Sequence, residues 1–210
     1  MNKKHIVEFI GTFFLVFTVG CAAVLGLADK MAPLAIGSVL MVMIFAGGHV
    51  SGAHYNPAVS LAVLLRGKLT SKELPGYLIA QVLGAVLAAL FVMRVVNGGA
   101  KLPSPTEMAL MPALFAEFVF TFGLCYVVLN VATAKGTAGN SFYGLAIGFT
   151  VMAGAFAVGR VSGGVFNPAV GVGLVVMKAM AVKTLLMYIL AQLAAAFVAS
   201  AVFHKTNGDD

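Results

Sequence analysis

The chain has 210 residues, of which 61% are hydrophobic and only 10% are charged, and its mean hydropathy is +1.03. A soluble domain carries about 25% charged residues, so this composition excludes a soluble globular domain and predicts a polytopic membrane protein. The net charge of +6 is spread over the polar loops and not gathered in one patch, which argues against nucleic acid as a partner.

Apolar runs separated by turn residues predict an all-α fold in one membrane domain over residues 1–210. A bilayer needs about 20 apolar residues per spanning helix. Spanning helices are expected at about 5–27, 33–52, 72–96, 107–132, 141–161 and 180–203. The first run is too long for a signal-peptide core, so it is expected to stay as a permanent helix. The polar tail over 204–210 is expected to fray.

Two further apolar runs, at about 56–65 and 167–177, are too short to span and are predicted to be re-entrant half-helices. Each begins with an Asn-Pro-Ala motif after a Gly-rich approach. Asn is a good helix N-cap, and Pro is favoured at the first helical position. Irregular backbone at membrane depth survives only when it is packed in protein or lines a water-filled cavity. The motif residues are Asn56, Pro57, Ala58, Asn167, Pro168 and Ala169.

The chain is an internal repeat, with repeat 1 over about 1–100 and repeat 2 over about 107–210. An offset of 111 residues places Asn56 on Asn167 and also aligns Tyr77 with Tyr188 and Gln81 with Gln192. Three spanning helices per half is an odd number, so the second copy must enter from the opposite face. The half-helices then approach the midplane from opposite sides, and their positive N-terminal ends meet there.

Two Asn-Pro-Ala motifs in SGxxxNPAV contexts, within an inverted three-plus-three repeat, resemble the aquaporin or major intrinsic protein family. The resemblance covers nearly the whole chain. It implies a passive channel for water and small uncharged solutes, with glycerol, urea, ammonia and hydrogen peroxide as candidates. It also implies no cofactor, a homotetramer with one pore per subunit, and both termini on the cytoplasmic side of the cell membrane.

The midplane motifs have a physical role in such a pore. Amide N–H groups of Asn56 and Asn167 would face a shared space, and the two helix dipoles would repel cations and protons. The alternative to a role in permeation is that the two asparagines are only structural helix caps that hold a packed loop. The family resemblance implies that carbonyl groups of the approach loops line the file of permeants, namely those of Gly52, Ala53, His54, Gly163, Gly164 and Val165.

The outer selectivity filter departs from the family pattern. Most aquaporins have Arg three places after the second Asn, whereas this chain has Val170 there and Val59 at the mirror position. Matching the chain to the family pattern gives Ile36, Ala155 and Gly164 as the other filter positions. Water-selective members of the family have Phe, His and a small residue at these places. A wide apolar filter should reject larger neutral solutes less well, whereas a narrow apolar ring would impede water by dewetting. The sequence leaves both outcomes open.

Glu8 and Glu117 are the acids within the first helix of each repeat. Charges in a membrane interior cost about 2.5–3.5 kcal/mol or more and usually mark function. One interpretation is a proton relay. The other, which aquaporin relatives resemble, is that each carboxylate accepts N–H groups from its own re-entrant loop.

The remaining polar residues suggest no chemistry. His49 and His54 are interpreted as loop-tethering or vestibule groups, with pH sensing as the alternative, and Arg160 is a candidate to replace the missing filter Arg. Neither His has Cys, Asp or Glu nearby at ligand spacing, so no metal site is expected. Cys21 and Cys125 lie in apolar helices and are interpreted as structural thiols. No nucleophile, phosphate loop or carboxylate pair points to an enzyme.

Two other classes of function remain open. A secondary transporter with inverted repeats should have midplane ionisable residues beyond the two Glu, and the sequence offers none. A closed structural membrane protein would give liposomes no added permeability. Lysine and arginine divide almost evenly between the two faces, so the orientation rests on the family resemblance.

Overall fold

The computed structural model describes residues 2–102, 105 and 108–208. Within them, every regular element is helical, and six helices are long and apolar enough to cross a membrane. The α-helices are α1 (Lys3–Val19), α2 (Ala32–Ser51), α3 (Pro57–Leu65), α4 (Leu74–Phe91), α5 (Leu110–Thr133), α6 (Tyr143–Ser162), α7 (Pro168–Val176) and α8 (Val182–Asn207). Shorter elements are η1 (Gly20–Val24), η2 (Asp29–Met31), η3 (Val92–Val96) and η4 (Lys135–Thr137).

The six spans and two half-helices confirm the predicted fold class, with ends shifted by a few residues. The first residue expected in the fourth span, 107, lies outside the described residues. Two features differ from expectation. The first and third spans end in the π-helical turns η1 and η3. The tail was expected to fray from 204, but α8 continues to Asn207, whose amide Nδ2 donates to Asn130 Oδ1 at 3.2 Å. The last two residues lie outside the described part.

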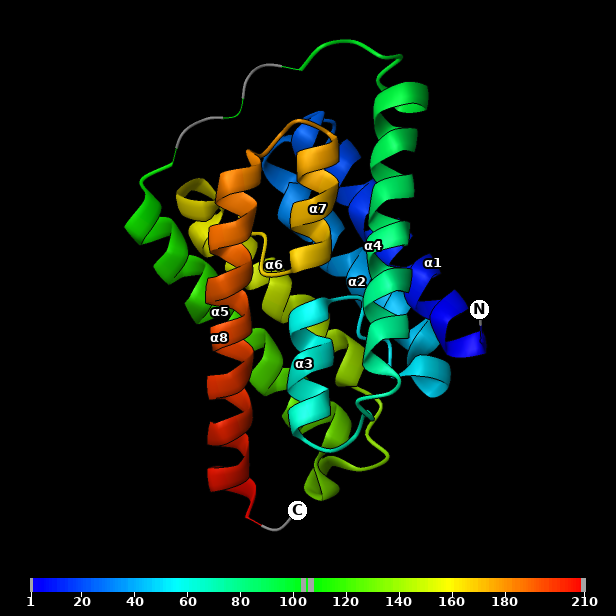
Figure 1. Cartoon of the computed structure of the whole chain (residues 1–210), viewed down its shortest axis with the longest axis vertical. Coiled ribbons are helices and arrows are strands. Elements are labelled where there is room, and N and C mark those ends of the chain that lie inside the picture. Colours follow the sequence, from blue (N-terminus) through cyan, green and yellow to red (C-terminus); the bar gives the residue numbers. More distant parts are fainter. Residues whose placement is uncertain (1, 103–104, 106–107, 209–210) are drawn as a thin grey trace.

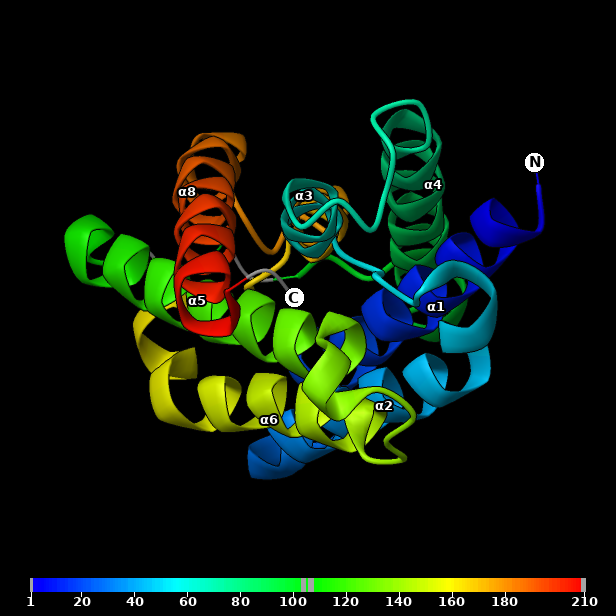
Figure 2. The ribbon, with the colours of Figure 1, turned by 90° about the horizontal axis from the view of Figure 1, so that it is seen from below.

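The two half-helices occupy the middle of the bundle. Figures 1 and 2 show α3 and α7 nearly end to end between α4 and α8. Each half-helix also packs against a spanning helix of the other half, α3 on α8 and α7 on α4. The two halves are therefore interlocked, and the inner ends of α3 and α7 face each other.

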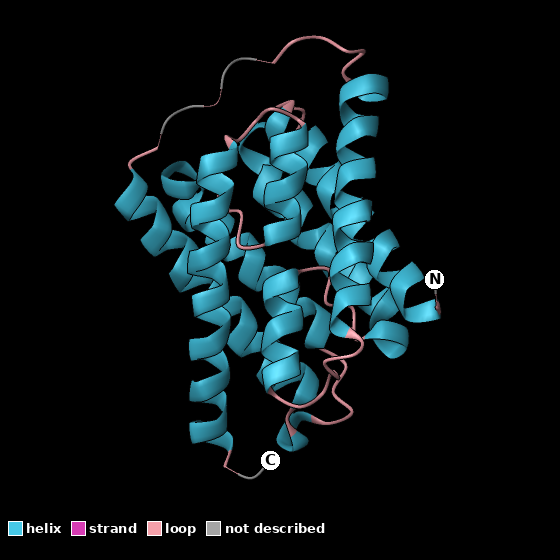
Figure 3. Ribbon diagram, in the orientation of Figure 1, coloured by secondary structure: helices cyan, strands magenta, loops and turns pink. Residues whose placement is uncertain are grey.

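Glycine ends the spans that lead into the two half-helices. Gly52 follows α2 with φ 85°, and Gly163 follows α6 with φ 87°. This left-handed conformation is the usual helix C-cap and favours a residue without Cβ. The chain turns there into the short interior loops that Figure 3 shows leading to α3 and α7.

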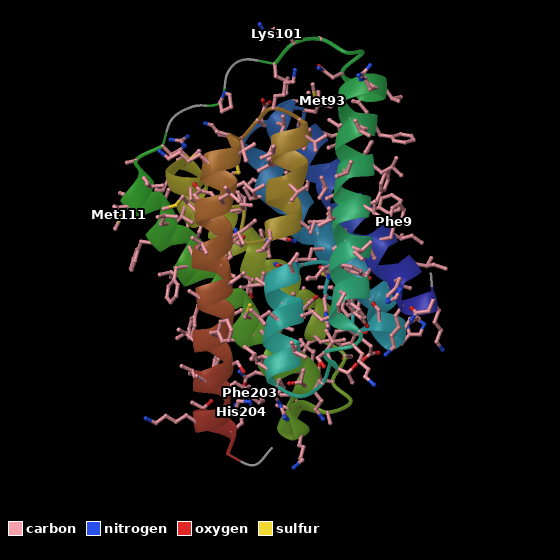
Figure 4. All side chains as sticks on the ribbon, in the orientation of Figure 1. Phe9, Met93, Lys101, Met111, Phe203 and His204 are labelled. Atoms are coloured by element: carbon pink, nitrogen blue, oxygen red, sulfur yellow. The ribbon has the colours of Figure 1, made fainter. Side chains whose placement is uncertain are left out.

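Close helix contacts hold the bundle around these loops. At the crossing of α1 and α4, a Cβ on Gly84 would lie only 2.5 Å from the Phe9 carbonyl oxygen. The end of α8 also contacts the end of α3, where the Arg66 guanidinium lies 4.9 Å from the ring centre of Phe203. Figure 4 places Phe203 and His204 at this contact. Exposed apolar side chains such as Met111, which is 74% exposed, cover the outside of the bundle and suit a lipid environment.

Candidate functional site

The two Asn-Pro-Ala motifs start the half-helices by the same local geometry. Asn56 has extended backbone, and its Oδ1 accepts from the Ala58 N–H at 2.9 Å. Asn167 Oδ1 accepts from the Ala169 N–H at 2.9 Å. A side chain that caps in this way satisfies one of the N–H groups left free at a helix start. Both asparagines are almost fully buried.

The same two asparagines also bind each other's loop. Asn56 Nδ2 donates to the Phe166 carbonyl at 2.9 Å, and Asn167 Nδ2 donates to the Tyr55 carbonyl at 2.8 Å. One hydrogen of each amide is thus used between the halves, and the second stays available at the midplane. The motif alone did not indicate this crossed pairing.

Glu8 is a multiple hydrogen-bond acceptor behind the first loop. Its carboxylate accepts from Ser51 Oγ at 2.7 Å and from the backbone N–H groups of His54 at 2.9 Å and Tyr55 at 2.7 Å. Gln81 Nε2 donates to it at 2.8 Å. The carboxylate is fully buried, so these donors replace its hydration.

Glu117 repeats this arrangement in the second half. It accepts from Ser162 Oγ at 2.8 Å and from the N–H groups of Val165 at 2.9 Å and Phe166 at 2.7 Å. Gln192 Nε2 donates at 2.8 Å. Each carboxylate therefore fixes the loop of its own half, a geometry that matches the loop-tether interpretation.

Two tyrosines complete the support of the loops. Tyr77 Oη donates to the Ser51 carbonyl at 2.6 Å, and Tyr188 Oη donates to the Ser162 carbonyl at 2.8 Å. These residues and the two glutamines aligned in the sequence repeat, but no role was predicted for them. Their identity at matched buried positions was the available signal.

The loops are held in a strained backbone conformation. Tyr55 has φ 50° and Phe166 has φ 49° at equivalent places. Bulky residues rarely adopt this left-handed region, at a cost of about 1–3 kcal/mol each. The Tyr55 ring fits between Gly11 and Gly47, where a Cβ would come within 2.1 Å of ring or hydroxyl atoms. Packing and the two carboxylates together hold these residues in place.

A cavity of about 700 Å³ reaches from the α7 side of the molecule to the two motif asparagines. The residues matched to the family filter, Ile36, Ala155, Gly164 and Val170, all contribute to its wall. From the loops, the wall includes Ala53, His54, Gly163 and Val165, whereas Gly52 is exposed and does not line it. The side chains at Ile36, Ala155 and Val170 are apolar, and Gly164 has none.

Much of the cavity wall was not predicted. The unpredicted part includes residues on four spans, namely Leu15 and Val19, Leu40, Leu124 and Val128, and Ile147 and Val151. These spans are apolar on all sides, so periodicity does not separate the lipid face from the cavity face. The wall also includes Met108, Met180, Lys183 and Met187.

Several candidate residues lie away from this site. His49 and Arg160 are exposed in the last turns of α2 and α6, and neither lines the cavity. Arg160 therefore does not replace the filter Arg in this conformation. Cys125 is buried and Cys21 is half-buried, both as free thiols. Among the described residues, no group of three His, Cys, Asp or Glu side chains is placed to hold a metal ion.

Six apolar spans, with two half-helices meeting inside them, define an integral membrane protein. The family model described as "Major intrinsic protein" matches residues 1–159 and 143–209. The chain belongs to this family, whose members are channels and not enzymes.

Similar proteins and a solved structure support the assignment to this family. The chain is similar to aquaporin NIP1-1 of Zea mays, with 39% identity over 184 residues that cover 81% of this chain and 63% of that protein. It is 37% identical to aquaporin NIP3-1 of Arabidopsis thaliana, covering 81% of this chain and 57% of the relative. The chain thus spans less than two thirds of the length of these relatives. The aquaglyceroporin structure from Plasmodium falciparum matches with a TM-score of 0.82 and 25% identity, covering 96% of this chain and 95% of that one.

Proposed function

We propose that the protein is a passive channel for water and small uncharged solutes, with glycerol, urea, ammonia and hydrogen peroxide as candidate solutes. One observation carries the proposal: a single cavity joins the α7-side surface to the paired asparagines at the midplane. Two helix N-termini face each other there, and their partial positive charges oppose the passage of cations and protons. Membership of a channel family supports the same function.

The proposed selectivity filter is formed by Ile36, Ala155, Gly164 and Val170. None of these side chains carries a charge or a hydrogen-bond donor, and three of them are small or short. An Arg at the position of Val170 would add five N–H donors and a fixed charge. Its replacement by Val supports a wider and less polar opening, through which solutes larger than water can pass.

The second candidate is a water-selective or poorly conducting channel. It is favoured by the apolar character of the same four residues, because an apolar constriction gates by dewetting. A secondary transporter has less support, since the two buried carboxylates already accept hydrogen bonds from their loops. A structural membrane protein without flux is the remaining outcome.

Liposome swelling with the parent and the Val170→Arg variant tests the proposal. The parent should carry water and at least one of glycerol, urea, ammonia or hydrogen peroxide faster than empty liposomes do. Val170→Arg should lower the ratio of urea or glycerol flux to water flux, because the guanidinium narrows and polarises the opening. Val170→Leu is the matched control, since it adds bulk without charge and separates the two effects. An unchanged ratio in folded Val170→Arg protein would favour the water channel, and a parent no better than empty liposomes would favour the structural protein.

The proposed setting is a cell membrane, with both termini on the cytoplasmic side and four identical subunits that each have a pore. Family membership supports these assignments. Cross-linking of the reconstituted protein and protease access to the α8 end in oriented vesicles would test them separately.

A further inference from the structure

The two halves differ where the first and third spans of each half cross near the membrane surface. In the first half, Lys4 of α1 forms an ion pair of 2.7 Å with Glu73, the N-cap residue of α4. The two buried glutamates, at positions 8 and 117, lie 109 residues apart, and the same offset places Lys4 on Ala113. The offset of 111 residues that aligns the Asn-Pro-Ala motifs places Glu73 on Thr184. The second half therefore has a methyl group and a hydroxyl group where the first half has an ion pair.

This replacement opens the second crossing to the cavity. Ala113 in α5 and Thr184 in α8 both line the cavity wall, whereas Lys4 and Glu73 do not. Ala113 is buried and Thr184 is half-buried, so neither side chain extends far from its helix. The cavity thus reaches the crossing of α5 and α8, and the crossing of α1 and α4 stays outside it.

A single cation stands in the wall at this crossing. Within the described residues, Lys183 is the only residue with a formal charge that lines the cavity. It lies in the first turn of α8, which begins beside the outer end of α7 (Figure 1), so it marks the outer end of the cavity. Its exposed ammonium group makes no hydrogen bond or ion pair with the described part of the chain. A cleft with charge of one sign and low-dielectric walls concentrates the counter-ion, so this end of the cavity attracts anions.

The surroundings of Lys183 suit an anion with an apolar body. Met180 and Met187 also line the wall, and Met187 lies one helical turn after Lys183 on the same face of α8. Methionine side chains adapt to apolar ligands of varied shape. Thr184 adds a hydroxyl group that has no partner among the described residues. Sites for small molecules are mostly apolar, have a few polar groups and enclose about 300–1,000 Å³, a range that includes this cavity of about 700 Å³.

We propose that the outer end of the cavity, at the crossing of α5 and α8, binds a small organic monoanion. Its anionic group pairs with the Lys183 ammonium and accepts from the Thr184 hydroxyl, and its apolar part lies against Met180 and Met187. The ligand class is a carboxylate or sulfonate with a compact apolar body. A bound anion occupies the path of the solute and slows it, and this consequence alone rests on the proposed channel function.

Binding is tested on the full chain in detergent, by calorimetric titration at neutral pH. Benzenesulfonate is the probe, because it is a permanent anion with an apolar ring, and benzenesulfonamide is the neutral probe of similar shape. The parent should bind the anion about fivefold more tightly than the amide, the upper end of what an exposed ion pair contributes. Lys183→Gln should remove this difference, and Lys183→Arg should keep it. Equal affinity of the parent for the two probes would overturn the proposal.

Two further variants separate the site from the charge of the whole surface. Lys178→Gln removes an exposed lysine that follows α7 and does not line the cavity, so it should leave the difference between the probes unchanged. Thr184→Glu introduces the residue found at the matching place of the first half, and its carboxylate should repel the anion and remove the difference. If Lys178→Gln weakens the anion as much as Lys183→Gln does, surface charge explains the binding and the proposed site is wrong.

Urea flux into liposomes distinguishes the site from the channel function. Benzenesulfonate present on both sides should slow urea flux through the parent and should slow it less through Lys183→Gln. If the anion binds but the parent carries no more urea than empty liposomes do, the channel function fails and the site stands. If urea passes and the anion does not bind, the channel function stands and the site fails. Binding that leaves urea flux unchanged would show that the anion lies outside the solute path, against the proposal.

Discussion

Asn56 of the first half donates its side-chain amide to the carbonyl oxygen of Phe166 in the second half, at 2.9 Å. The reciprocal bond joins Asn167 to Tyr55 at 2.8 Å. Each asparagine thus caps its own helix with its oxygen and holds the opposite loop with its nitrogen. Substitutions that change only the nitrogen separate these two roles.

Asn56→Asp and Asn167→Asp should each destabilise the protein and weaken the barrier to cations. The new carboxylate keeps the cap but loses the amide donor, at about 0.5–1.5 kcal/mol for the hydrogen bond plus repulsion from the carbonyl oxygen. Melting temperature in detergent and potassium leak from liposomes are the measurements. Asn97→Asp is the control, because Asn97 Nδ2 makes the same kind of bond, to the Ala100 carbonyl, in an exposed turn. If both variants fold and their liposomes show no added potassium leak, the midplane barrier to cations has another origin.

Glu8→Ala should prevent folding before it alters selectivity. It leaves the N–H groups of His54 and Tyr55 without their acceptor, at about 1–3 kcal/mol for each buried donor left unpaired. Yield of monodisperse protein and melting temperature report this loss. Glu73→Ala removes a half-exposed carboxylate whose ion pair with Lys4 is worth at most about 1 kcal/mol, so it serves as the control for a small loss. A well-folded Glu8→Ala protein whose flux changes its pH dependence would instead support a proton relay.

Gly84→Ala should destabilise the contact between α1 and α4. The added Cβ would lie 2.5 Å from the Phe9 carbonyl oxygen, and overpacking of this kind costs about 1–3 kcal/mol. Gly123→Ala is the matched control within α5, where a Cβ meets nothing within 4 Å of it. The control should be neutral or gain up to about 1 kcal/mol from helix propensity. Equal melting temperatures for the two variants in detergent would refute the close contact.

The ion pair between Lys4 and Glu73 should give a pH-dependent contribution to stability. Lys4 Nζ lies 2.7 Å from Glu73 Oε1, and this bond, with those from Thr70, lowers the pKa of Glu73 to about 2. A carboxyl group whose pKa is lower in the folded state stabilises the fold above its unfolded pKa. That contribution is lost as the pH falls from about 4.5 toward 2.

Lys4→Gln should therefore lower the melting temperature at neutral pH, and the difference from the parent should shrink below pH 4.5. Both side chains are partly exposed, so the effect is small, about 0–1 kcal/mol. The exposed neighbour Lys3, changed to Gln, is the control. A difference that is constant from neutral to acid pH would show that the pair does not act through the charge of Glu73.

Composition, length and turn residues predicted the six spans, and Asn-Pro predicted the starts of both half-helices. These features depend on local chemistry, which a single sequence records. The π-helical ends η1 and η3 were not predicted, because apolar residues there are compatible with either helix type. Because the spans are apolar on all sides, the sequence also did not indicate which of their residues face the cavity.

The parts of the site that escaped prediction are contacts between distant residues. The bonds from Asn56 to Phe166 and from Gln81 to Ser60 depend on how the helices pack. The repeat did align Tyr77 with Tyr188 and Gln81 with Gln192, so it marked the positions without their partners. The filter role of Ile36, Ala155, Gly164 and Val170 stays a prediction until flux is measured.

The crossed amide bonds also set an order of events during synthesis. Their partners are separated by 110 and 112 residues in the chain. At a translation rate of about 5–20 residues per second, the first loop enters the membrane roughly 6–20 s before Phe166 is made. During that interval the loop can be held only by groups of the first half, such as Glu8 and Tyr77. The midplane closes only when the last third of the protein arrives.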